Sequence, residues 1–140
     1  MSPRDWLLLL FHGADEPIDR VRVQKALFLF SRRSNAPADQ KYEFRPYKYG
    51  PFSFEIYPDL DVLVGEGTLK EDRVPWMTSP VYSLTAVGRS RADELRAAAP
   101  GNRLALLDGV RRYVLQHDFA TLLNEVYRLY PEFATRSVFR

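Results

Sequence analysis

Residues 47–67 constrain the fold more than any other part of the sequence. They read YKYGPFSFEIYPDLDVLVGEG, an aromatic stretch that passes through a Gly-Pro pair into a short apolar run. The Gly-Pro pair predicts a turn. In the run that follows, Ile56, Leu60, Leu63 and Val64 recur at helical spacing. The segment therefore predicts extended chain, a turn and a buried helix in immediate succession.

The limits of this helix follow from its flanking residues. Ser53 is the expected N-cap, and Gly65 and Gly67 end the helix. Pro58 lacks a backbone donor and clashes with the preceding turn of a helix, so we expect a kink or break near Tyr57.

Two short strands are predicted after this helix, at residues 68–71 and 80–84, with residues 72–79 as the loop between them. Pro80 stands at a strand's first residue, where proline is tolerated. Upstream, Tyr42 and Phe44 alternate with charged residues in a period-2 pattern that predicts a short extended segment, and Pro46 makes it an edge or irregular piece.

Five further helices are predicted from caps and apolar stripes. They cover residues 3–13 after the cap Ser2, 20–33 after Asp19, 86–98 after Thr85, 103–115, and the stretch from Asp118 to the residue before Pro131. The first is apolar nearly all round, so we expect it to be buried on several sides. In the second, Arg20, Arg22, Lys25, Arg32 and Arg33 are expected to lie away from the apolar stripe. In the helix predicted at residues 86–98, Val87, Ala92 and Leu95 are expected to face inward.

The order helix, helix, extended segment, helix, strand, strand, helix, helix, helix predicts an α+β, mainly helical chain. We interpret it as a winged helix-turn-helix with a two-stranded wing and a C-terminal helical extension. The 140 residues, 46% of them hydrophobic, suit a single domain. We expect a winged-helix core over residues 1–98 and the helical extension over residues 99–140.

Several short motifs resemble a known family. The segment RVQKALFL at residues 22–29 is similar to the LQKLLFL-type helix of the YwgA-like and SocA-like (Panacea) antitoxin-related bacterial proteins. Residues 47–53 resemble their Tyr-Gly-Pro motif, which residues 56–57 and 60–63 extend. Residues 82–88 resemble their Leu-Thr-x-x-Gly segment, and residues 127–137 their C-terminal Tyr-Pro region. Pro58, inside the motif helix, departs from the pattern.

The resemblance implies a non-enzymatic antitoxin or adaptor module that recognises another protein. The residues themselves agree with the absence of catalysis. The chain has no Cys, and its two histidines, His12 and His117, have no neighbouring ligands that would complete a metal site. The carboxylates Glu55, Asp59, Asp61 and Glu66 do not share one helix face, and Ser53 has no identifiable base. We therefore expect no catalytic residue, metal, cofactor or small-molecule substrate.

Cytoplasm is the expected location, because a chain without Cys suits a reducing compartment. The longest apolar run near the N-terminus, at residues 6–11, is far shorter than the roughly 20 apolar residues that span a bilayer. No membrane partner is expected.

Charge is divided unevenly along the chain. Residues 20–50 carry eight basic and two acidic side chains, whereas residues 51–72 carry six acidic side chains and one lysine. The helix that would read DNA in a winged helix is therefore acidic, and facing phosphates would be repulsive. A bipolar surface of this kind suits docking onto another protein or self-association.

The predicted partner-binding residues are Tyr47, Tyr49, Phe52, Tyr57, Asp59 and Asp61, because seven aromatic side chains fall within residues 42–57. The last ten residues, 131–140, are also too apolar for a free tail, and Phe133, Val138 and Phe139 are expected to pack on this chain or a partner. The alternative is a DNA-binding winged-helix regulator. Its contacts would come from Arg20, Arg22, Arg32, Arg33, Lys41, Lys48 and the wing residue Arg73, near Arg89 and Arg91.

Overall fold

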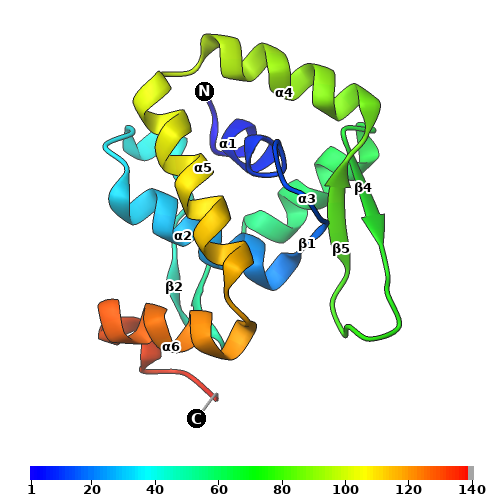
Figure 1. Cartoon of the computed structure of the whole chain (residues 1–140). Coiled ribbons are helices and arrows are strands. Elements are labelled where there is room, and N and C mark those ends of the chain that lie inside the picture. The colour runs from blue at the N-terminus through cyan, green and yellow to red at the C-terminus, as the bar shows by residue number, and fades with distance from the viewer. Residues whose placement is uncertain (139–140) are drawn as a thin grey trace.

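The structure is a computed structural model that describes residues 1–138 (Figure 1). Helices and strands of this part alternate in the order α1 (Pro3–Leu10), β1 (Ile18–Asp19), α2 (Arg20–Arg33), η1 (Ala38–Gln40), β2 (Arg45–Tyr47), β3 (Gly50–Phe52), α3 (Ile56–Gly65), β4 (Leu69–Asp72), β5 (Val81–Leu84), α4 (Ala86–Ala98), α5 (Gly101–Gln116), α6 (Phe119–Leu129) and η2 (Pro131–Ala134). The expected α+β, mainly helical class is confirmed.

Helix α1 lies within the core, where it contacts α2, α3, α4 and α5, and α5 also packs directly against α2 (Figure 1). All its residues from Trp6 to Leu10 are buried, as its apolar character predicts. Ser2 caps it with a capping box: the Asp5 N–H donates to Ser2 Oγ, and the Ser2 N–H donates to Asp5 Oδ2 (2.9 Å).

One hydrophobic cluster runs through the helices on both sides of residue 98. It includes Trp6 and Phe28 from the first part of the chain and Leu107, Val126 and Phe133 from the last. Phe133 packs its ring against Phe28, with centroids 4.7 Å apart. The expected division into a winged-helix core (residues 1–98) and a helical extension (residues 99–140) stays a prediction. The hydrophobic cluster contains residues from both parts. Val138 is exposed, although its N–H donates to Lys48 O (2.9 Å), and Phe139 lies outside the described residues.

The hairpin predicted from residues 68–71 and 80–84 is confirmed. Strands β4 and β5 are antiparallel, with Leu69 opposite Leu84 and Asp72 opposite Val81. The sequence did not predict a third strand, β1, which pairs with the other edge of β5 and makes the order β1-β5-β4. With only two residues, β1 is too short for periodicity to reveal it.

The start of α4 is joined to the start of β4. The Thr85 N–H donates to Thr68 O (3.1 Å), and the Thr85 side chain caps α4 by accepting from Gly88 N (3.0 Å). Gly88 lies so close that a Cβ there would overlap the Thr68 carbonyl oxygen. The threonine and glycine of the Leu-Thr-x-x-Gly segment, at residues 84–88, therefore have distinct structural roles. Thr85 caps α4, and Gly88 permits the close approach of α4 to the Thr68 carbonyl.

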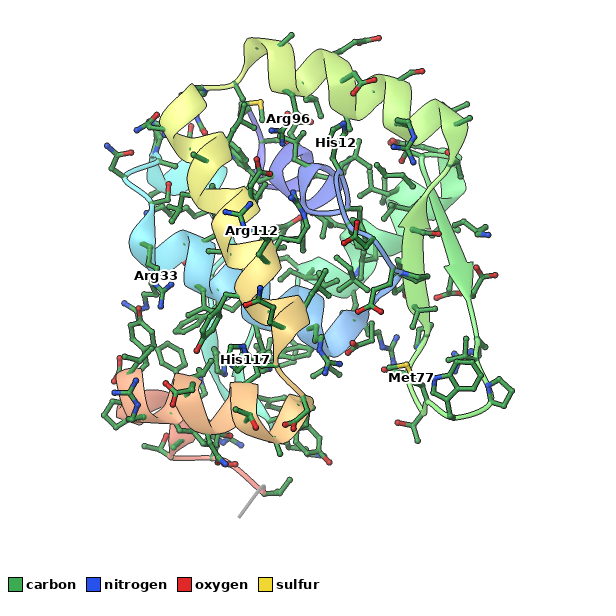
Figure 2. The ribbon with its side chains drawn as sticks, in the orientation of Figure 1. His12, Arg33, Met77, Arg96, Arg112 and His117 are labelled. Carbon is green, nitrogen blue, oxygen red and sulfur yellow. The ribbon has the colours of Figure 1, made fainter. Side chains whose placement is uncertain are left out.

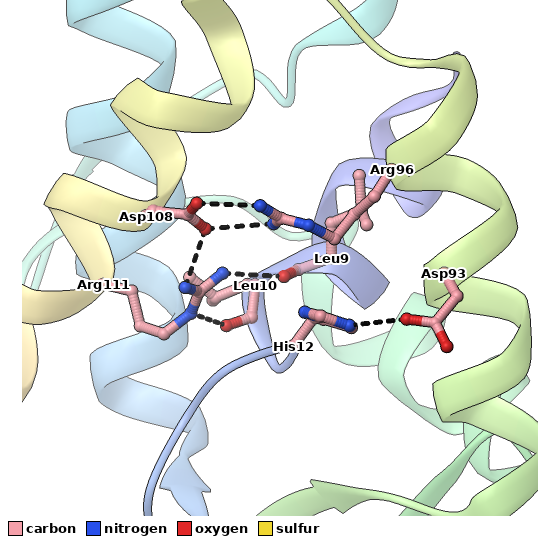
Figure 3. A network of polar contacts seen from close by, with 7 residues as sticks. All are labelled: Leu9, Leu10, His12, Asp93, Arg96, Asp108 and Arg111. Atoms are coloured by element: carbon pink, nitrogen blue, oxygen red, sulfur yellow. Dashed lines mark hydrogen bonds and ion pairs between the residues drawn. The ribbon is translucent and has the colours of Figure 1, made fainter. Parts of the chain in front are cut away.

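A buried guanidinium closes the other end of α1 (Figure 3). Arg111, on α5, donates to Leu10 O and, over 2.9 Å, to Leu9 O, which are carbonyls of the last turn of α1. Arg111 also pairs with Asp108 (2.9 Å), which receives two bonds from Arg96 of α4 (3.1 and 2.9 Å). Beside this network, His12 Nε2 bonds to Asp93 (2.8 Å). The contacts fix α1, α4 and α5 relative to one another.

The expected break in α3 is wrong. The helix runs without interruption from Ile56 to Gly65, and Pro58 lies in its first turn, where the backbone N–H would have no helical acceptor. Ser53 is not its N-cap either, since the cap position is Glu55 and makes no side-chain bond. Ser53 instead lies in the segment between β3 and α3, where its buried backbone bonds to the side chain of Gln24.

The turn expected at Gly50-Pro51 lies two residues earlier. Lys48 and Tyr49 form the turn, and residues on both sides pair as β2 and β3, with Tyr47 opposite Gly50 and Pro46 opposite Pro51. The two prolines share a pair without ladder hydrogen bonds, so neither missing N–H is needed. Gly50 has φ +88°, which favours glycine, and a Cβ there would lie 2.9 Å from Leu123 of α6.

Other expectations differ at single positions. Ala92 and Leu95 face the core as predicted, but Val87 is 62% exposed, because Gly88 beside it takes the packed side of α4. Helix α1 ends at Leu10 rather than near Gly13, and α5 starts two residues earlier than predicted.

Replacing Gly88 with alanine is predicted to destabilise the protein by about 1–3 kcal/mol, because the new methyl group overlaps the Thr68 carbonyl. Urea unfolding followed by circular dichroism measures the effect. Gly65→Ala is the matched control. Its Cβ meets nothing within 4 Å inside α3, so this change should be neutral or stabilising by up to about 1 kcal/mol.

Asp108→Ala should destabilise by about 3 kcal/mol at neutral pH, because it leaves the buried Arg111 without its counter-ion. Burial alone raises the pKa of Asp108, but hydrogen bonds from Arg96 and Arg111 outweigh it, so the net pKa is lowered. The stabilisation is therefore present above about pH 4 and lost as the pH falls through the folded pKa. Unfolding measured from neutral to acid pH should show wild type and variant converging. The control Asp15→Ala, on an exposed loop, should change stability by less than about 0.5 kcal/mol at any pH.

Candidate functional site

The candidate site is a groove between α2, the β2–β3 hairpin, the start of α3 and the loop that joins β4 to β5. Two adjoining recesses, of about 430 Å³ and about 400 Å³, share Val21, Tyr49, Thr78 and Ser79. We call the two together the aromatic groove. Its other lining residues are Asp19, Arg20, Arg22, Gln24, Lys25, Tyr47, Lys48, Gly50, Phe52, Tyr57, Trp76, Met77 and Phe119.

Gln24 holds one wall of the groove in place. Its side chain is fully buried, and its Nε2 donates to Ser53 O (3.0 Å) while its Oε1 accepts from Ser53 N (2.8 Å). Both backbone groups of Ser53 are thereby satisfied, as they would be by a neighbouring strand. This pair joins the middle of α2 to the segment between β3 and α3, which explains why Ser53 is buried.

Lys25 lies at the floor of the groove. The sequence placed it on an outward face of α2, and this was wrong, since its residue exposure is 2%. Its Nζ donates to Pro51 O (3.2 Å). Burial lowers the pKa of Lys25 to about 7, and the negative charge of Asp19 opposes only part of that shift.

Aromatic rings make one side of the groove. Tyr47 and Phe52 have ring centroids 5.0 Å apart, and Phe52 lies 5.1 Å from Tyr57 in an edge-to-face arrangement. The Arg20 guanidinium covers the Tyr57 ring at 4.4 Å. Tyr49, 47% exposed, meets Phe119 of α6 at 5.9 Å. Rings packed against one another in this way form a surface that is apolar and rigid.

The opposite side is the loop between β4 and β5. It carries Trp76, which is 80% exposed, and Figure 2 shows the neighbouring Met77 near the end of that loop. A tryptophan exposed to this degree beside a groove has no role in the core. Its apolar area is available to a bound molecule.

The structure gathers four of the six predicted partner-binding residues in this groove: Tyr47, Tyr49, Phe52 and Tyr57. Asp59 lies elsewhere, where its carboxylate accepts from Tyr42 Oη (2.6 Å) and pairs with Arg4 (3.3 Å). Asp61 is exposed on α3. The aromatic members of the predicted set therefore share one surface with Lys25, and its two acidic members do not line that surface.

The residues of the nucleic-acid alternative fall into three places. Arg20, Arg22 and Lys48 line the aromatic groove. At the other end of α2, Arg33 is on the far side of the molecule from Met77 (Figure 2). Arg32 there pairs loosely with Glu132 (3.9 Å), and Lys41 donates to Ser34 O (2.8 Å). The third place is the exposed loop residue Arg73.

A larger recess, of about 640 Å³, lies between the end of α1 and α5. His12, Arg96, Asp108 and Arg111 line it, and each of them already bonds to another protein group (Figure 3). The buried charged groups of this recess thus have structural partners, whereas Lys25 at the groove floor has no direct ion pair with any residue of 1–138. We therefore place the candidate site in the smaller recesses.

Sequence reasoning missed Gln24, Lys25 and Trp76. A tryptophan in a predicted loop was a signal for the last of these. Apolar periodicity could not reveal that Gln24 and Lys25 are buried. Residues 23–30 of α2 are buried on every face, so polar positions there do not mark a solvent-exposed side.

Neither metal binding nor membrane insertion is indicated by the described residues. Within residues 1–138, no three His, Asp or Glu side chains lie close enough to hold a metal ion. In the same part of the chain, every helix is too short or too polar to cross a membrane.

Comparison with known proteins gives no match, either to protein-family profiles or to curated protein sequences.

Gln24→Met is predicted to destabilise the protein by about 2–4 kcal/mol. It keeps the side-chain volume but leaves the buried N–H of Ser53 without a partner and removes one of the two donors to its C=O. Chemical unfolding measures the loss, and amide exchange at Ser53 should become faster. The control Gln116→Met, exposed at the end of α5, should change stability by less than about 0.5 kcal/mol.

Proposed function

We propose that this chain is a protein-interaction module, antitoxin- or adaptor-like, that binds a segment of its partner in the aromatic groove. The observation that carries the proposal is the convergence of Tyr47, Tyr49, Phe52 and Tyr57 on one groove, opposite the exposed Trp76. Clustered aromatic side chains of this kind supply most of the binding energy at protein interfaces.

The proposal includes a winged-helix architecture. In it, α2 and α3, which are joined by the segment that contains β2 and β3, form the helical part. The β4–β5 hairpin is the wing, and α5 with α6 is the extension. The β1-β5-β4 sheet and the contacts of Thr85 with Thr68 are consistent with it. The resemblance to Panacea-type proteins remains a proposal that supports the same function.

DNA reading by α3 is not proposed. Its first turn contains Asp59, Asp61 is exposed on it, and Glu55 and Glu66 flank it. A helix with these charges repels phosphates. The basic residues that would bind a duplex are divided among three places, so they do not form one continuous strip along the molecule.

The test is capture of a partner followed by reconstitution with the purified partner. Trp76→Ala and Tyr49→Ala should each weaken the purified complex by about 2 kcal/mol, roughly 30-fold, because each removes an exposed ring from the groove. Titration calorimetry gives the affinities, and circular dichroism should show both variants folded.

Val87→Ala is the matched control, since Val87 is 62% exposed on α4 and is not part of the groove. It should leave the affinity unchanged. Equal affinities for wild type, Trp76→Ala and Tyr49→Ala would place the interaction elsewhere and reject the groove. Tight, salt-sensitive binding of duplex DNA that depends on Arg32 and Arg33 would favour the regulator instead.

A further inference from the structure

We propose that the aromatic groove takes an acidic peptide segment, one carboxylate of which accepts hydrogen bonds from Nζ of Lys25 at the groove floor. This inference deepens the proposed function and rests on it. It names the chemistry of the partner segment and the residue that selects it.

The first support is the hydrogen bonding of Lys25. An ammonium group has three donors. Among the bonds of residues 1–138, Nζ donates only to Pro51 O (3.2 Å), although the residue is 2% exposed and lines the groove. A buried donor without an acceptor is costly, so a ligand that supplies an acceptor gains affinity there.

The second support is charge complementarity. Arg20, Arg22, Lys25 and Lys48 line the groove, and among its described lining residues Asp19 alone is acidic. Asp19 is already engaged, because it accepts from Arg22 Nη1 (2.8 Å) and from the Arg22 backbone (3.0 Å). The groove therefore carries excess positive charge, which selects an acidic segment.

A peptide fits this arrangement better than a nucleic acid does. Lys25 is one buried cation, so one carboxylate suffices to pair with it. The rings of Tyr47 and Phe52, which pack together in the same recess, offer an apolar surface to the neighbouring side chains of a peptide. A nucleic acid would bring a row of phosphates past the acidic residues of α3, where Glu55 and Asp61 are exposed.

The proposal predicts that affinity falls as the pH rises. Burial lowers the pKa of free Lys25 to about 7, so the fraction that is charged declines above neutral pH. A bound carboxylate favours the charged form. Binding at about pH 6 should therefore be tighter than at about pH 8.5, by roughly tenfold or more.

Other titratable groups face Lys25 from several elements. They are Asp19 and Arg20 at the start of α2, Tyr47, Lys48 and Tyr49 of the hairpin, Tyr57 of α3 and Tyr127 of α6. None is a histidine, the side chain whose ordinary pKa lies in this pH range. His117, between α5 and α6, bonds through Nδ1 to Tyr113 O (2.7 Å) and is tested separately.

The experiment uses the full chain and a display library of linear peptides. A selected peptide is kept when Trp76→Ala weakens its binding, which establishes that it occupies the groove. Its affinity is then measured from about pH 6 to about pH 8.5, alongside versions in which each Asp or Glu is replaced by Asn or Gln. We expect one such replacement to weaken binding about tenfold at the lower pH and to remove the pH dependence.

Lys25→Met should have the same two effects, because it keeps the buried stem and removes the donors. Lys48→Met and His117→Asn are the controls, and both should keep the pH dependence. If Lys25→Met does not fold, the pH profile of the wild type with the Asn and Gln peptides still decides the question.

Different failures are distinguishable. Groove-dependent peptides that lack an acidic residue, or that bind equally well at both pH values, overturn the carboxylate inference and leave the proposed function standing. Failure to select any groove-dependent peptide overturns both. Binding of a single-stranded oligonucleotide in the groove, with displacement of the peptide, also overturns the inference.

Discussion

The pair Gln24 and Lys25 is the constraint on which the functional surface depends. These neighbours in α2 bond to the backbone of residues 51 and 53, and so they fix a strand and the entry to α3 against a buried helix. Gln24 does this with an amide that imitates a strand's pair of hydrogen bonds. Lys25 does it with a cation that lines the groove. One dipeptide therefore positions the aromatic rings and supplies the charge beneath them.

The parts of the fold that depend on local chemistry could be predicted from sequence. The caps Ser2, Asp19, Thr85 and Asp118 each form in the structure, and the hairpin of β4 and β5 has the expected partners. Apolar periodicity located the helices to within a few residues.

Two of the failures have a different cause, because they depend on contacts between distant segments. Lys25 is buried since the chain of residues 50–53 covers it, and β1 exists since β5 offers it an edge. Pro58 was mistaken for a breaker because the start of the helix was placed too early. For the candidate site, sequence pattern identified the rings, whereas the residues that orient them had no periodic signal.

The buried guanidinium at the end of α1 has a consequence for how the chain folds. The carbonyls of Leu9 and Leu10 accept hydrogen bonds from Arg111, which lies 102 and 101 positions later. The most apolar helix thus comes first in the chain but is completed by a segment near the other end. During synthesis from the N-terminus, α2, α3 and α4 can cover parts of α1, but the side that α5 covers stays open until α5 exists. Such a long loop closure slows folding, and it makes the interval before α5 arrives the time at which this protein is most exposed to aggregation.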